Sequence, residues 1–225
     1  INSTSSIKKT IFASSRLVCK LGYTPLDEND YLPSTLYGES KVETEKIIKA
    51  SDIRCDWCIV RPTSIWGPWF GIPYRTFFDT VKAGHYIHPL GLEITKLFGF
   101  VGNSVFQIEK LLKAKGHLIH KKVFYLADYE SIEVLQLAKK IRKGFGRSNF
   151  ILKLPLAFLK IIAFFGDILK IFGIKNPPLT SFRLENLTTN MNFDMENIIE
   201  VVGQDLPYSL DDAVNETVNW MKNES

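Results

Sequence analysis

Three short apolar runs constrain most strongly what this chain can fold into. They cover residues 8–14, 57–62 and 122–128, they lack strict polar–apolar alternation, and helical segments separate them. Strands that are buried on both faces read as nearly continuous apolar runs, and such strands belong to parallel sheets covered by helices. The sequence therefore predicts an α/β protein built on a parallel sheet.

The segments between these runs carry helix signals. A helix is expected to begin at a cap on Ser34 or Thr35 and to reach about Ala50, with Glu45 and Lys49 spaced i,i+4 as a pair. Further helices are expected over residues 72–83, where Gly84 ends the helix, 103–116, 131–146, where Ser131 is the cap, and 206–222.

One long apolar segment, residues 150–175, raises the question of a membrane span. Four charged residues interrupt it, whereas a spanning helix needs ~20 predominantly apolar residues with few charges. We expect an amphipathic helix or helix pair, broken near Gly166 and packed on the protein's own core or over a cleft. Contact with a membrane surface through Lys and Phe is the alternative.

Composition narrows the class of protein. The chain has 225 residues, of which 45% are hydrophobic, enough for one large domain or a domain with a smaller lobe. A scattered net charge of +4 does not favour a nucleic-acid partner. Three cysteines and no visible signal peptide indicate a reducing, cytoplasmic setting. Cys55 and Cys58 form a lone CxxC, so no metal site is expected.

Polar residues gather where two of the expected strands end. Ser14 and Ser15 leave the first strand, and residues 60–68, VRPTSIWGP, leave the second. Tyr37 opens the intervening helix, with Lys41 one turn further on the same face. In parallel α/β sheets ligands bind outside the carboxyl ends of strands, so these segments are expected to converge on one rim.

Such a rim could move a proton to or from an alcohol. A lysine ammonium beside the Tyr37 phenol would lower its pKa from about 10, and the Ser15 hydroxyl could hold the substrate oxygen. The accompanying hydride needs a nicotinamide, because side chains cannot supply one. Tyr-x-x-x-Lys alone is a weak signal in a chain with 8 tyrosines, and an ordinary solvated Tyr and Lys is the alternative.

The order of these blocks resembles a known family. The stretches KTIFASSRLVC (9–19), LYGESKVETEKII (36–48) and CIVRPTSIWGPWFG (58–71) are together similar to the extended short-chain dehydrogenase/reductases, in particular the NAD-dependent epimerase/dehydratase family. Weaker similarity continues through the rest of the chain. The resemblance implies the C-terminal part of a Rossmann-like, doubly wound parallel sheet with a smaller mixed α/β substrate-binding lobe.

The resemblance also implies roles for individual residues. Ser15, Tyr37 and Lys41 would be catalytic, with Tyr37 as acid/base and Lys41 on the nicotinamide ribose. The cofactor would be NAD, with NADP not excluded, and the substrate a nucleotide sugar. The further expected contacts are Ser14, Pro62 and Thr63 to the cofactor and Ser64, Asn103 and Arg183 to the substrate. Arg61 is expected to make a structural ion pair or cap instead.

Two departures from the family shape the expectation. No strand followed by G-x-x-G-x-x-G is found, so residues 1–82 and 98–129 are expected to form only part of a nucleotide-binding domain. Residues 83–97 and 130–225 would form the substrate lobe and C-terminal helices. Arg16 and Leu17 stand where sugar dehydratases of the family carry Asp and Glu, which argues for epimerisation or simple oxidoreduction.

Three functions remain open on sequence grounds. The leading one is a nucleotide-sugar epimerase or oxidoreductase. The alternatives are a 3β-hydroxysteroid-type or other alcohol dehydrogenase, and a non-catalytic dinucleotide-binding module. Homodimers through paired helices are usual in the family, and here a homodimer would place part of the Tyr37 helix in an interface.

Overall fold

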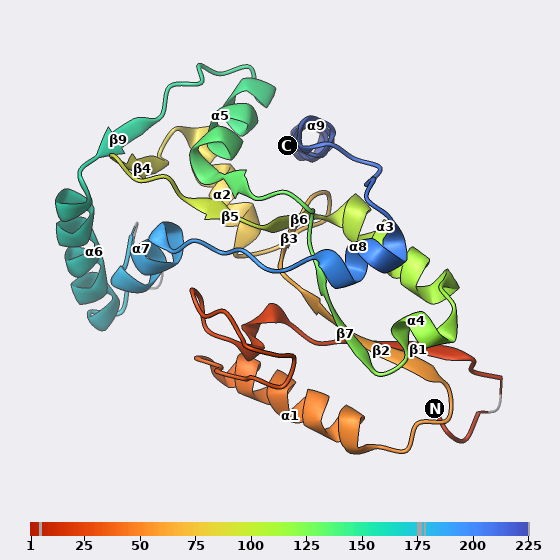
Figure 1. The fold of residues 1–225 in the computed structure, drawn as a ribbon. Helices are drawn as coiled ribbons and strands as arrows, with labels where there is room; N and C mark the ends of the chain where they lie inside the picture. Colours follow the sequence, from red (N-terminus) through yellow and green to blue (C-terminus); the bar gives the residue numbers. More distant parts are fainter. Residues whose placement is uncertain (5, 175–176, 178, 225) are drawn as a thin grey trace.

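A three-stranded parallel sheet forms the lower part of the molecule in the computed structural model, which describes residues 1–4, 6–174, 177 and 179–224 (Figure 1). The strands run in the order β1 (Lys9–Ala13), β2 (Asp56–Pro62) and β7 (Lys122–Leu126). All three were predicted from the apolar runs, and the parallel pairing and the α/β class are confirmed.

Alternate residues of β2 belong to two different cores. Trp57 and Ile59 pack with Ile48 of α1 (Leu36–Ala50) on one face of the sheet. Cys58 and Val60 pack on the other face, where α3 (Val101–Lys113) and α8 (Glu196–Val202) cover the sheet. Because both faces are covered, β2 reads as the continuous apolar run from which it was predicted.

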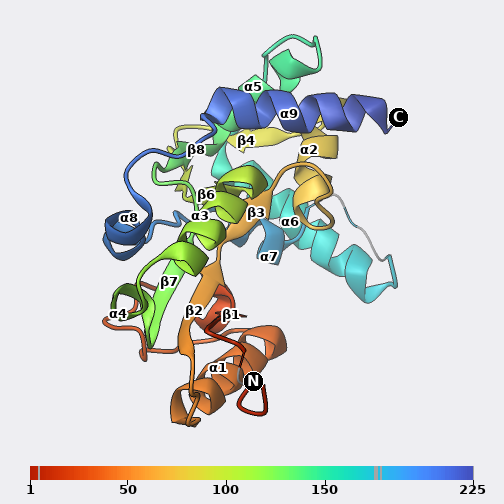
Figure 2. The ribbon, with the colours of Figure 1, turned by 90° about the vertical axis from the view of Figure 1, so that its right-hand side faces the viewer.

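The upper part of the molecule has a core of its own. Three helices, α2 (Tyr74–Ala83), α5 (Val134–Gly144) and α9 (Leu210–Asn223), pack around Trp66, Phe78 and Phe100 (Figure 2). Short strand pairs link this part to the sheet. They are β3 (Ser64–Trp66) with β6 (Phe98–Phe100), β4 (Ile87–Pro89) with β9 (Leu152–Leu154), and the antiparallel β5 (Thr95–Lys96) with β8 (Ile132–Glu133).

Most predicted helix ends are confirmed. The Thr35 hydroxyl accepts a hydrogen bond from the backbone of Gly38 and caps α1, and α2 ends at Gly84 with φ of 84°. Ser209 caps α9 with a complete capping box. The cap predicted at Ser131 is wrong, because residues 132–133 pair with β5 and α5 begins only after them.

The apolar segment forms one continuous helix, α6 (Leu156–Ile171), so the break predicted near Gly166 is wrong. Gly166 instead lets the Leu179 segment pack closely against α6, since a Cβ at position 166 would lie 1.7 Å from the carbonyl oxygen of Leu179. Beside α6 lies α7 (Ser181–Thr188) (Figure 1). Across the described residues, no helix combines the length and the apolar content that crossing a membrane requires.

Most of the α6 surface is not covered, contrary to the expected packing on the protein's own core. Only a narrow stripe, Leu159, Ala163 and Gly166, is buried. The large apolar side chains on its remaining surface are exposed, and they include Phe158, Ile161, Phe164, Phe165 and Ile171. The helix therefore presents an extended apolar face to its surroundings.

The two cores do not follow the predicted domain boundaries everywhere. Helix α2, placed with residues 1–82 on sequence grounds, packs on α5 and shares its core. Helix α8, placed with residues 130–225, packs on α3 and β7 beside the sheet. The division into a nucleotide domain and a substrate lobe otherwise stays a prediction.

Candidate functional site

The carboxyl ends of β1 and β2 bring the predicted segments together. The backbone N–H of Ser14 donates to the carbonyl of Val60 at 2.8 Å, which extends the pairing of the two strands beyond Ala13. The Lys41 ammonium donates to the carbonyl of Ala13 at 3.1 Å. The Tyr-x-x-x-Lys helix is therefore tied directly to the end of β1.

A second contact fixes the start of this helix. Gly38, next to Tyr37, lies against η1 (Arg16–Val18), the single 3₁₀ turn that follows Ser15. A Cβ at position 38 would lie 2.2 Å from the carbonyl oxygen of Leu17. Only glycine allows this approach, and it holds the Tyr37 turn beside the Ser15 segment.

Ser15 is oriented by its own backbone. Its hydroxyl oxygen accepts a hydrogen bond from the N–H of Leu17 at 3.1 Å and caps η1. Within the described part of the chain, no acceptor is found for the hydroxyl hydrogen of Ser15. A serine in this state can donate to an incoming oxygen atom.

Tyr37 and Lys41 lie on one face of α1. The Lys41 ammonium is 5.7 Å from the centroid of the Tyr37 ring. Tyr37 is 52% exposed, and its hydroxyl bonds to none of the residues that the structure describes. The ammonium uses one of its three donors on Ala13, so two remain for a ligand.

Beneath this rim lies a buried polar network centred on Glu45. The Ser14 hydroxyl donates to the Glu45 carboxylate at 2.5 Å, and the Tyr31 hydroxyl donates to it at 3.0 Å. Arg61 binds the same carboxylate, which confirms its predicted structural ion pair. The predicted pair of Glu45 with Lys49 is wrong, because Lys49 turns away to Glu28, Asn29 and Tyr31.

The network sets the charge state of its members. Burial alone would raise the pKa of Glu45, but the hydrogen bonds and charge of Arg61, with the hydroxyls of Ser14 and Tyr31, lower it below its usual value. Burial and the Glu45 carboxylate raise the pKa of Tyr31. The Ser14 hydroxyl thus serves the interior, and its predicted contact with the cofactor stays a prediction.

The predicted residues after β2 are held by β7 and β6. Pro62 pairs with Leu126, and the Thr63 hydroxyl donates to the Leu126 carbonyl at 3.1 Å. Ser64 begins β3 and pairs with Phe98. Pro62 therefore ends β2 next to β7, and Thr63 follows it.

Asn103 and Arg183 have other partners. The Asn103 carboxamide is buried, donates to Asp128 at 2.8 Å and to the Tyr208 carbonyl at 3.0 Å, and accepts from the Tyr208 backbone. Arg183 is exposed on α7 and donates to the Pro177 carbonyl at 2.7 Å. Their roles as substrate contacts stay predictions, and the bonds of Asn103 indicate a structural role.

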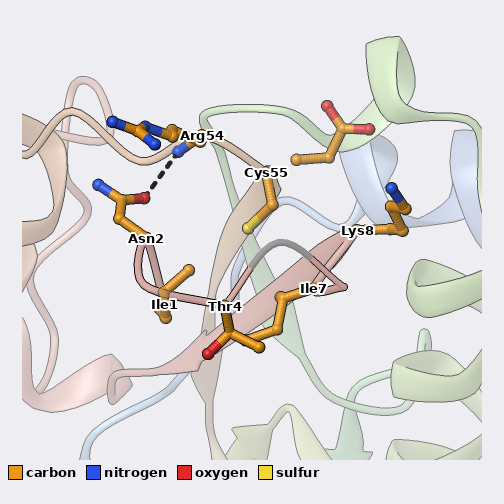
Figure 3. A pocket seen from close by; sticks show the side chains of 8 residues that line it. Ile1, Asn2, Thr4, Ile7, Lys8, Arg54 and Cys55 are labelled. Carbon is orange, nitrogen blue, oxygen red and sulfur yellow. Dashed lines mark hydrogen bonds between the residues drawn. The ribbon is translucent and has the colours of Figure 1, made fainter.

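A shallow pocket lies at the opposite end of the strands (Figure 3). Lys8 and Ile7 precede β1, Cys55 precedes β2, and the Asn2 side chain accepts from the Arg54 backbone at its edge. The amino ends of parallel strands are not where such sheets bind ligands. Burial raises the pKa of the neighbouring Cys58 to about 12, so this thiol stays protonated at neutral pH.

Comparisons with known proteins agree on the fold. No family model matches the chain. It is 24% identical to a 3β-hydroxysteroid dehydrogenase/decarboxylase of Arabidopsis thaliana and to a UDP-glucose 4-epimerase of Vibrio cholerae, each over 95% of the chain. A 3β-hydroxysteroid dehydrogenase of Mycolicibacterium neoaurum is 22% identical over the same share. The chain spans only 53%, 63% and 62% of these relatives.

A solved structure extends the likeness to the backbone. The UDP-glucuronic acid 4-epimerase of Bacillus cereus, solved in complex with NAD, superposes with a TM-score of 0.69 at 15% identity, covering 98% of this chain and 63% of that one. The fold is that of the extended short-chain dehydrogenase/reductases. A putative epimerase of Burkholderia cenocepacia gives the same TM-score at 16% identity. The predicted fold class is confirmed, and these relatives and neighbours are consistent with the predicted superfamily.

Proposed function

We propose that this chain is the catalytic part of an NAD(P)-dependent epimerase or oxidoreductase that acts on an alcohol carbon of a nucleotide sugar. The observation that carries the proposal is the docking of the Tyr37 helix on the end of β1. Lys41 binds the Ala13 carbonyl, and Gly38 abuts the Leu17 carbonyl, so an acid/base and a hydroxyl donor share one rim. An ordinary solvated Tyr and Lys would need neither contact.

The three side chains divide the work of proton transfer. The Ser15 hydroxyl, already oriented by Leu17, donates to the substrate oxygen and holds it. The Tyr37 phenolate takes the proton of the substrate alcohol, and the resulting phenol returns it when the carbonyl is reduced. The Lys41 ammonium stabilises negative charge on the phenol oxygen as the proton leaves.

The residues present fit the nicotinamide end of the cofactor. Lys41 has two donors left for ribose hydroxyls, and Pro62 and Thr63 would lie against the ring at the end of β2. When bound there, NAD would supply the reversible hydride acceptor that the side chains lack. The structural neighbour with NAD bound supports the choice of NAD, and NADP is the variant to test.

Similarity to the UDP-glucose 4-epimerase and the UDP-glucuronic acid 4-epimerase supports a nucleotide-sugar substrate. Ser64 would contact the sugar, and the exposed guanidinium of Arg183 suits a diphosphate. Arg16 and Leu17 beside Ser15 offer no carboxylate pair for dehydration, so we expect epimerisation or simple reduction.

A 3β-hydroxysteroid-type dehydrogenase is the second candidate. Two of the three relatives named above carry that activity in their names, including the one from Arabidopsis thaliana. The same Ser15, Tyr37 and Lys41 would then act on a sterol hydroxyl. This candidate predicts net formation of NADH, whereas an epimerase returns the hydride to its substrate.

The experiment compares UDP- and dTDP-sugars with hydroxysteroids as substrates of the purified protein in the presence of NAD. Sugar interconversion without accumulation of NADH is the expected result. Tyr37→Phe should lower kcat by roughly 10²–10⁴-fold while leaving the melting temperature unchanged, because the hydroxyl makes no bond inside the described structure. Tyr208→Phe is the matched control. Full activity of Tyr37→Phe would overturn the assignment.

A further inference from the structure

Two buried cations without a carboxylate partner lie close to the candidate site. Arg16, which directly follows Ser15, is 4% exposed, and Lys96 of β5 is 9% exposed. In the described part of the chain, neither forms an ion pair. Arg61 is buried as deeply, but it is paired with Glu45, so Arg16 and Lys96 differ from it in having no carboxylate partner.

The Arg16 guanidinium is incompletely satisfied. It donates to the carbonyls of Cys19 and Lys20 at 3.2 Å each, and its plane lies 5.4 Å from the centre of the Phe193 ring. A further N–H faces only the sulfur of Met191, at 3.2 Å, and sulfur is a weak acceptor. The Nε–H, although buried, has no partner among the described residues.

Lys96 approaches the same place from the upper part of the molecule. Its neighbours Thr95 and Leu97 are hydrogen-bonded to the backbone of Met191, and its ammonium donates to the Asn186 carbonyl. Burial, and then the positive charge of Arg16, lower the pKa of Lys96 to about 8. Arg16 and Lys96 thus lie on either side of Met191, close enough for their positive charges to repel each other.

Burying a cation without an anion is costly, and proteins compensate by pairing it. Here the two charges come from different parts of the fold and lie on either side of Met191. A carboxylate has two oxygens, which match the open Nε–H of Arg16 and its N–H on the weak sulfur acceptor, and the Lys96 ammonium would add its charge.

We propose that Arg16 and Lys96 bind a carboxylate group of the substrate, which makes the substrate an acidic alcohol such as a glycuronate unit. The inference rests on the proposed function, in which Ser15 holds the substrate oxygen. Arg16 follows Ser15 directly, and the Cα atoms of the two residues are about 3.8 Å apart. The oxygen held by Ser15 and the carboxylate held by Arg16 then belong to one small molecule. No bond is made or broken by either cation.

The test measures binding separately from turnover. Titration calorimetry with UDP-glucuronate and UDP-glucose compares ligands that differ at one carboxylate and share the diphosphate. A hydroxysteroid carboxylic acid and its methyl ester form the corresponding pair for the second candidate function. The wild-type protein should bind the acid of at least one pair at least 10-fold more tightly than its neutral counterpart.

Variants locate the preference. Arg16→Met and Lys96→Met should each remove most of it and leave the neutral ligand's affinity within about twofold, while Arg54→Met, an exposed arginine, is the control. Arg16→Lys, which keeps the charge, should restore part of the preference and guards against a folding defect. Absence of a preference in both pairs overturns the inference. Equal losses for acid and neutral ligand overturn it as well, since the cations would then serve the diphosphate or the fold.

Failure of the proposed function gives a different result. Tyr37→Phe should keep the carboxylate preference in calorimetry and lose turnover. If turnover survives in Tyr37→Phe, the catalytic assignment is wrong whatever the binding data show. If Arg16→Met binds the acid ligand with the same preference as wild type, only the carboxylate site at Arg16 and Lys96 is refuted.

Discussion

The Glu45 carboxylate and the Arg61 guanidinium are joined by two hydrogen bonds of 2.9 and 2.7 Å inside the protein, where both side chains are at most 1% exposed. Glu45 belongs to α1, the helix of Tyr37 and Lys41, and Arg61 belongs to β2. The pair therefore fixes the helix that carries Tyr37 and Lys41 to the central strand of the sheet. The Ser14 hydroxyl donates to the same carboxylate, so the residue that precedes Ser15 is fixed to this pair as well.

Removing one partner of this pair should destabilise the protein strongly. Glu45→Gln and Arg61→Met are each expected to lower the free energy of unfolding by about 3–5 kcal/mol, because each leaves a buried polar or charged group without its partner. Urea denaturation measures the loss. Glu43→Gln, which breaks the exposed pair with Lys46, is the control and should cost at most about 1 kcal/mol. A loss in Glu45→Gln or Arg61→Met as small as that in Glu43→Gln would contradict the stabilising role assigned to the buried pair.

The same carboxylate predicts how stability depends on acid. Because the folded-state pKa of Glu45 is lowered, its contribution is present above the unfolded pKa of about 4.3 and is lost as pH falls through the folded value. The difference in unfolding free energy between wild type and Glu45→Gln should therefore be constant from pH 7 to 5. It should shrink below pH 4. A difference that stays constant to pH 3 would show that folding does not lower the pKa of Glu45.

Lys96 predicts that stability also rises with pH in the alkaline range. Its folded-state pKa, lowered by burial and by Arg16 to about 8, lies below the unfolded value, so the unfolded chain binds the proton more tightly between these values. Raising the pH from 7.5 to 9.5 should stabilise wild type relative to Lys96→Met by about 2 kcal/mol. Chemical denaturation at both pH values measures this. A bound carboxylate should reduce the gain, because it favours the charged ammonium.

Gly166 predicts a packing effect that sequence pattern does not suggest. Gly166→Ala should destabilise the protein by roughly 1–3 kcal/mol, although alanine is the better helix former, because its Cβ would collide with the Leu179 carbonyl. Gly71→Ala is the matched control, since no atom lies within 4 Å of a Cβ placed there. Thermal unfolding of the two variants compares them. An unchanged melting temperature for Gly166→Ala would mean that α6 and the 179–180 segment separate easily.

The sheet and the docking of the Tyr37 helix on the end of β1 could be predicted from sequence because their signals are local or follow strand order. Apolar runs gave β1, β2 and β7, and cap residues gave the ends of α1, α2 and α9. The two- and three-residue strands were missed, because they depend on partners far away in the chain. The pairing of residues 132–133 with β5 displaced the expected Ser131 cap for this reason.

Two residues show why the rest of the site escaped prediction. Glu45 has Lys49 at i,i+4, yet Arg61, 16 residues later, takes it inside a buried environment where the interaction is stronger. Asn103 was placed with the substrate by resemblance, yet in the structure its carboxamide bridges Asp128 and Tyr208. Local spacing cannot reveal which distant segment will meet a side chain.

The contact between Gly38 and the Leu17 carbonyl has a consequence for how this protein could change its specificity. Because main chain touches main chain, this one contact between α1 and the turn after Ser15 is made without any side chain. Side chains around this rim can then vary in size and charge while the contact between the two main chains is kept. The protein could therefore accommodate new substrates through changes in the surrounding side chains, while the contact between Gly38 and the Leu17 carbonyl stays the same.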